Sequence, residues 1–162
     1  MTETASTKIP RPSAEHQRLE AFVGTWLVEG ESFAESQNPD DPRASAVAWS
    51  GEDSWQWLPG GFFLRHEGHA QLGTHTLVSS EIIGHDGAKG GYFSRMFDNA
   101  GFHPEYEGAV EGDVWTFSDP SSRSRMVFSE GGNRLKIDWE WRHDGSDWLP
   151  LCDLVATRAA VR

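Results

Sequence analysis

The sequence predicts an all-β protein: a closed antiparallel up-and-down β-barrel of eight to ten strands, with one short N-terminal helix. Three observations predict this fold. Apolar and polar residues alternate with a period of two through most of the chain after Gly24. The 17 glycines and 8 prolines are spread between these segments as turn signals. A length of 162 residues suits one domain, and closure pairs the edges that an open sheet would expose.

The first elements are an arm and a helix. Residues 1–12 are polar and contain two prolines, so we expect a flexible N-terminal arm ahead of a single domain, 13–162. A helix is expected over 14–22, because Ser13 is a good N-cap and apolar residues follow at helical spacing. Gly24 stands where such a helix should end.

The remainder of the chain is predicted to form consecutive hairpins. Alternation is clearest in 135–142, where four apolar residues alternate with four charged ones and place Trp139 and Trp141 on one face. Glycine, asparagine and aspartate fill the intervening turns. The expected strands are 25–34, 45–50, 53–58, 61–71, 74–84, 91–98, 103–110, 113–118, 123–130, 133–143 and 147–158, of which the second and third can be one interrupted strand.

Composition limits the partners and the compartment. Fourteen basic and 25 acidic residues give a net charge of −11, which repels nucleic acid and anionic membrane surfaces. With Cys152 as the only cysteine, an intrachain disulfide is impossible and a reducing compartment is expected. Residues 1–12 lack the apolar core of a signal peptide, and no segment is apolar enough for a membrane span. The predicted location is therefore cytoplasmic.

The candidate site lies on the hairpin around Leu72-Gly73. With these two residues as the turn, Gln71 pairs with Thr74, His66 lies opposite Ser79, and Leu64 lies opposite Glu81. The more apolar face of this hairpin is the better inward face, and across the barrel it should meet the two indoles of 135–142. The predicted ligand-binding residues are Phe62, Leu64, His66, Leu77, Ser79, Glu81, Trp139 and Trp141.

Neither a metal site nor a nucleophile is predicted. His66 and His69 are three residues apart and point to opposite faces of a strand, and no His, Asp or Glu set has a recognised ligand spacing. Cys152 lies on an apolar strand, where a buried inert thiol is the usual case. No cofactor is predicted, although haem bound through His66 or His75 is kept as an alternative.

Several motifs resemble those of one family. Gly24-Thr25-Trp26 follows the predicted helix and opens the first strand, as does the Gly-x-Trp signature of lipocalins and other calycins. With 19–23, 29–31, 57–64 and the closing Thr157-Arg158, the sequence resembles the bacterial family of domain of unknown function 1579, which forms calycin-like barrels. The resemblance implies that Trp26 plugs the closed end of the barrel and that Arg158 packs across its face.

A more distant resemblance is to the nitrobindin barrels, which bind haem through a histidine near the C-terminus. Here the last histidine is His143, and the final expected strand, 147–158, contains none. The haem ligand of that family therefore has no matching position in this chain.

The sequence leaves three functions open. The favoured one is a non-enzymatic barrel that binds a small hydrophobic or amphipathic molecule in its lumen. The second is an acid/base enzyme that uses His66 and Glu81. The third is a structural or interaction protein whose barrel is filled by its own Trp and Phe side chains.

Overall fold

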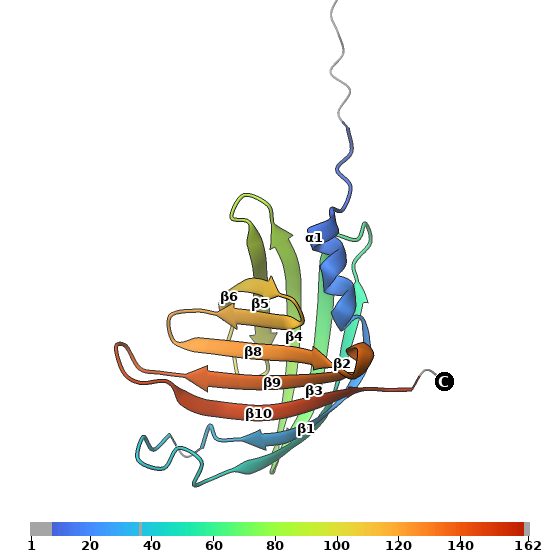
Figure 1. Cartoon of the computed structure of the whole chain (residues 1–162). Helices are drawn as coiled ribbons and strands as arrows, with labels where there is room; N and C mark the ends of the chain where they lie inside the picture. The colour runs from blue at the N-terminus through green and yellow to red at the C-terminus, as the bar shows by residue number, and fades with distance from the viewer. Residues whose placement is uncertain (1–7, 36, 161–162) are drawn as a thin grey trace, which may run out of the picture.

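The computed structural model shows a closed barrel of ten antiparallel strands (Figure 1), and it describes residues 8–35 and 37–160. Each strand pairs with its neighbours in the sequence, and the first pairs with the last. The predicted fold class is therefore confirmed. The strands are β1 (Gly24–Ser32), β2 (Val47–Trp57), β3 (Phe63–Leu72), β4 (His75–Asp86), β5 (Gly91–Asp98), β6 (Glu105–Glu111), β7 (Val114–Ser118), β8 (Ser122–Ser129), β9 (Arg134–Trp141) and β10 (Leu149–Arg158).

The N-terminal helix lies where the sequence predicts it, but its second half is tighter. An α-helical turn, α1 (Ala14–Gln17), continues as the 3₁₀ helix η1 (Arg18–Phe22). Three residues per turn align Leu19 with Phe22, and both side chains are fully buried in the barrel end. Of the predicted arm, residues 1–7 lie outside the described part of the chain, and residues 8–13 form neither helix nor strand.

The closed end of the barrel is built around Trp26. Its indole is 1% exposed, and its Nε1 donates a hydrogen bond of 2.8 Å to the carbonyl of Phe22. Trp26 pairs with Arg158 across the β1–β10 seam, and the guanidinium carbon lies 4.2 Å from the centre of the indole. The same guanidinium donates hydrogen bonds to the carbonyls of Val23, Ala21 and Gly132.

The signature glycine is required by this arrangement. Gly24 has a φ of +128°, in a region that side chains rarely adopt. A Cβ at this position would lie 2.8 Å from Nη1 of Arg158. Gly24 therefore leaves room for the guanidinium of Arg158, which covers the indole of Trp26.

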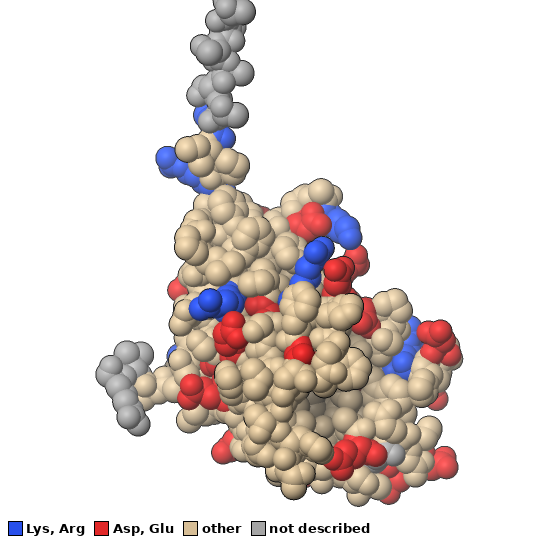
Figure 2. Space-filling view, turned by 180° about the vertical axis from the view of Figure 1, so that it is seen from behind, with Lys and Arg blue, Asp and Glu red and all other residues tan. Residues whose placement is uncertain are grey.

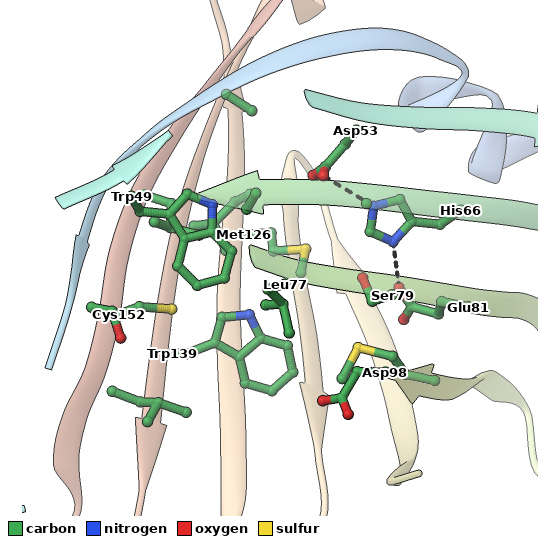
Figure 3. A pocket seen from close by; sticks show the side chains of 18 of the residues that line it. Trp49, Asp53, His66, Leu77, Ser79, Glu81, Asp98, Met126, Trp139 and Cys152 are labelled. Atoms are coloured by element: carbon green, nitrogen blue, oxygen red, sulfur yellow. Dashed lines mark hydrogen bonds and ion pairs between the residues drawn. The ribbon is translucent and has the colours of Figure 1, made fainter. Parts of the chain in front are cut away.

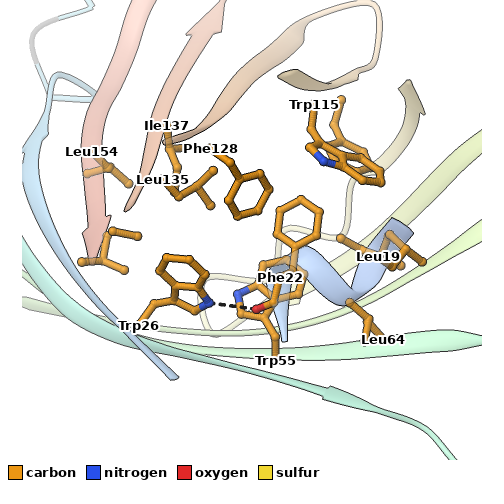
Figure 4. Packing of buried hydrophobic residues seen from close by; sticks show 14 of the residues in the cluster. Leu19, Phe22, Trp26, Trp55, Leu64, Trp115, Phe128, Leu135, Ile137 and Leu154 are labelled. Carbon is orange, nitrogen blue, oxygen red and sulfur yellow. Dashed lines mark hydrogen bonds between the residues drawn. The ribbon is translucent and has the colours of Figure 1, made fainter. Parts of the chain in front are cut away.

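The ring of Phe22 lies beside Trp26, among three other aromatic rings of the closed end (Figure 4). Its ring centroid lies 4.9 Å from that of Trp55, 5.1 Å from that of Trp115 and 5.0 Å from that of Phe128. These rings come from β2, β7 and β8, so one side chain of the helix segment joins strands that lie far apart around the barrel. The closed end is consequently solid.

The strands decide between two alternatives for one segment and correct one expected pairing. Segments 45–50 and 53–58 form one continuous strand, β2. In the β3–β4 hairpin, Leu72 pairs with His75, so Gly73 and Thr74 are the turn residues and the expected pairing of Gln71 with Thr74 is wrong. The reason is that Gly73, with a φ of +55°, takes the first central position of the turn and not the second.

The pairing error spans two residues and therefore conserves the direction of every side chain. His66 pairs with Glu81 instead of Ser79, and Leu64 pairs with Ile83 instead of Glu81. The inward face predicted for β3 and β4 is still the inward face, but the order of partners along it is changed.

Replacing Trp26 by alanine should lower the free energy of unfolding by about 3 to 5 kcal/mol, because it leaves a cavity in the closed end and removes the ring that Arg158 covers. Urea unfolding monitored by circular dichroism measures this change. The neighbouring Leu27 is 52% exposed, and Leu27→Ala should cost less than about 1 kcal/mol. Equal losses in the two variants would contradict the role of Trp26.

Candidate functional site

A cavity of about 360 Å³ occupies the barrel lumen above the aromatic closed end (Figure 3). Trp26 contributes to its floor, and Ala34, Leu72 and Phe102 lie near the strand ends at its opposite side. Most of the lining is apolar, as is usual for small-molecule sites. Large side chains that line it include Trp49, Trp55, Leu77, Met96, Met126, Trp139 and Leu154.

A polar cluster centred on His66 interrupts the apolar lining. Nδ1 of His66 lies 2.8 Å from Oε2 of Glu81, and Nε2 lies 3.4 Å from Oδ1 of Asp53 (Figure 3). The second contact is an ion pair without hydrogen-bond geometry, so Nε2 is buried without a hydrogen-bond partner. Ser94 donates a hydrogen bond to Oε1 of Glu81. The histidine thus lies between two carboxylates from different strands.

Trp55 supports the imidazole from one side. The two rings are nearly parallel, with 4.0 Å between centroids and 4° between planes, and the two residues are paired across β2 and β3. Trp55 in turn stacks on Phe22. The ring of His66 is thereby held by the same packing that closes the barrel.

Gly68, which has no side chain, leaves space for the polar side chains of Asp53 and Ser79. It pairs with Asp53 on one side and with Ser79 on the other. A Cβ at this position would lie 2.8 Å from Oγ of Ser79 and 3.2 Å from Oδ1 of Asp53. A side chain here would therefore push these polar groups apart.

The carboxylates determine the charge of His66. Burial alone would lower the pKa of its imidazole, but the interactions with the nearby carboxylates of Asp53 and Glu81 outweigh burial and raise the pKa to about 9. The side chain is only 12% exposed, so solvent screens these interactions weakly. His66 is therefore a buried imidazolium at neutral pH.

Five of the eight predicted ligand-binding residues line the cavity: His66, Leu77, Ser79, Glu81 and Trp139. The other three lie elsewhere. Leu64 is fully buried in the hydrophobic core, and the ring of Phe62 packs edge-on against His16 of α1. Trp141 ends β9 and packs against His143. Leu64 and Trp141 keep the predicted face of their strands but lie past the cavity along the barrel axis, and Phe62 precedes β3.

The sequence reasoning missed two acidic residues of the lining, Asp53 and Asp98. Alternation contains the signal for both. Asp53 lies two residues before the buried Trp55 on β2, and Asp98 continues the inward series of Tyr92 and Ser94 on β5. Cys152 also lines the cavity, and burial raises the pKa of its thiol to about 12, in agreement with an inert thiol.

Residues 8–35 and 37–160 contain neither a metal-binding cluster nor a membrane-spanning helix. No group of three or more His, Cys, Asp or Glu side chains in these residues could hold a metal ion. None of the helices described there is long and apolar enough to cross a bilayer.

The fold and the cavity define a class: small closed β-barrels with an internal, mainly apolar cavity. Within that class, the chain belongs to the family described as "Protein of unknown function (DUF1579)", whose model matches residues 11–141. The family suggested by the combined motifs is therefore confirmed. A comparison with curated protein sequences finds no match.

Two solved structures share the fold at low identity, and a third is less similar. Rv2717c from M. tuberculosis is 14% identical with a TM-score of 0.64, covering 91% of this chain and 99% of that chain. The S-type phycobiliprotein lyase CPES from Guillardia theta is 10% identical with a TM-score of 0.62, covering 93% and 100%. Zebrafish ileal bile acid-binding protein, complexed with cholic acid, is 15% identical with a TM-score of 0.48, covering 86% and 99%. The likeness to the first two structures concerns the fold alone.

The charged state of His66 should be visible in the pH dependence of stability. Its pKa is raised in the folded state, so its stabilising contribution is complete below its ordinary value near 6.5 and is lost as the pH rises through about 9. The difference in unfolding free energy between the wild type and His66→Gln should therefore shrink between pH 6.5 and 9. Urea unfolding across this range, together with NMR titration of the ring, measures it. Titration of His66 near pH 6.5 would contradict the assignment.

Proposed function

We propose that this protein is a non-enzymatic barrel that binds one small amphipathic molecule in its lumen. The observation that carries the proposal is the cavity of about 360 Å³, which is apolar over most of its wall and polar in one cluster around His66. Apolar walls supply affinity, whereas a few placed polar groups orient the ligand.

The distribution of aromatic residues supports binding over a wholly filled barrel. Phe22, Trp26, Trp115 and Phe128 pack together at the closed end, where they form part of the core. Trp49 and Trp139 instead line the open volume. The aromatic side chains thus fill one part of the barrel and leave the other part free for a ligand.

Within the acid/base and haem alternatives, two roles of His66 find less support: general base and haem ligand. Both roles require a ring nitrogen with a free lone pair, and an imidazolium has none. The nitrogens of His66 face Glu81 and Asp53, whose charges raise its pKa to about 9. His75, the other histidine considered for haem, is exposed at the β3–β4 turn.

We propose that the five lining residues bind the ligand. We also propose that the protein is located in the cytoplasm. Cys152 is free and buried, which is compatible with a reducing compartment.

Filling the lumen should abolish binding. Leu77 points into the cavity (Figure 3), and Leu77→Trp should weaken binding of the neutral apolar probe N-phenyl-1-naphthylamine about tenfold or more, because the larger ring occupies the ligand volume. Probe fluorescence measures the affinity.

The matched control is Thr76→Trp. Thr76 is the preceding residue on β4 and is exposed on the outer face of the barrel, so this variant adds the same ring outside the lumen. Its affinity for the probe should equal that of the wild type. Undiminished binding to Leu77→Trp, or no binding to the wild type, would contradict the lumen as the site.

A further inference from the structure

We propose that the lumen selects amphipathic molecules whose polar group is a cation, such as an alkylammonium, over carboxylates of the same chain length. This inference rests on the proposed function and names the ligand class of that site. Its basis is the sign and the placement of the charges on the cavity wall.

The wall carries three carboxylates, those of Asp53, Glu81 and Asp98, and none of its lining residues in the described part of the chain is Lys or Arg. The imidazolium of His66 lies between Asp53 and Glu81 and compensates one negative charge. The other lining histidine, His69, is exposed to solvent. Two negative charges therefore remain on a wall that is otherwise apolar.

Asp98 is the carboxylate best placed to meet a ligand. Its Oδ1 accepts hydrogen bonds of 2.9 Å from the backbone N–H groups of Ala100 and Phe102. These bonds fix the side chain without neutralising it, and no ion pair to Asp98 occurs within residues 8–35 and 37–160. Figure 3 shows the carboxylate on the cavity side of β5.

The charged groups of the lining lie on one wall of the lumen. In the closed ring of ten strands, β3, β4 and β5 stand across the lumen from β8, β9 and β10. His66, Glu81 and Asp98 belong to the first three strands. The strands opposite contribute Met126, Trp139 and Cys152 to the lining. A bound molecule would therefore meet carboxylates on one side and apolar side chains on the other.

This arrangement discriminates between ligand charges. A carboxylate moved into the lumen would lose its hydration and face an excess of two negative charges, because the imidazolium of His66 is already held between Asp53 and Glu81. Both effects are unfavourable. An ammonium loses hydration as well but gains charge-assisted hydrogen bonds to the same groups. The acidic side chains on the outer surface (Figure 2), with a net charge of −11, add to the attraction of cations.

The experiment compares octylamine, 1-octanol and octanoate at pH 7.5, where the amine is protonated and the acid is ionised. Titrations are followed by the fluorescence of the lining tryptophans and by calorimetry. We expect octylammonium to bind about tenfold or more tightly than octanoate, with octanol between them, and we expect added salt to reduce the difference.

Asp98→Asn tests the carboxylate with little change of shape, because the asparagine oxygen can still accept the two backbone hydrogen bonds. It should weaken octylammonium binding about three- to tenfold and leave octanol binding unchanged. The control is Glu67→Gln on the same sheet, which removes a carboxylate that is 37% exposed and does not line the cavity. That variant should bind all three compounds as the wild type does.

The outcomes separate this inference from the proposed function. If octanol binds in the lumen but octylammonium binds no more tightly than octanoate, the charge selectivity is overturned and the binding function stands. The charge selectivity is also overturned if Asp98→Asn and Glu67→Gln weaken octylammonium binding equally. If none of the three compounds binds and Leu77→Trp changes nothing, both proposals fail.

Discussion

The contact between Trp26 and Arg158 joins the first strand of the barrel to the last, and the rest of the structure depends on it. The guanidinium covers the indole and also bonds carbonyls that precede β1 and β9, so one side chain fixes the seam, the helix exit and a distant turn together. Because the barrel is a single ring of strands, fixing its seam fixes the order and tilt of all ten.

The helix segment then decides how much of the interior remains open. Phe22 enters from the closed end and holds Trp55, whose indole is also the platform for His66. The hydrophobic core and the charged cluster are therefore in direct contact, because Trp55 packs against Phe22 on one side and His66 on the other. A barrel without this plug would have a longer lumen but no rigid support for a buried imidazolium.

Much of the fold could be predicted from the sequence because alternation and turn residues are local signals. The inward face of β3 and β4 was predicted correctly despite a wrong turn, because an error of two residues does not change the side-chain direction. Partner identity is more sensitive, and the contact between His66 and Glu81 depended on the true register. Asp53 and Asp98 were missed because their place in the cavity wall depends on residues of neighbouring strands. Leu64 and Trp141 differ from the lining residues in depth along the barrel axis, which an alternation with a period of two does not indicate.

Gly68 shows how a site can depend on a residue without a functional group. Asp53 and Ser79 project into the space that a Cβ at Gly68 would occupy, so the spacing of these two side chains depends on the absence of a side chain here. A single methyl group would change the spacing of the cluster while leaving every ionisable residue in place. Ligand preference among related barrels can therefore diverge through steric changes at this position, with the complement of acidic and basic residues unchanged.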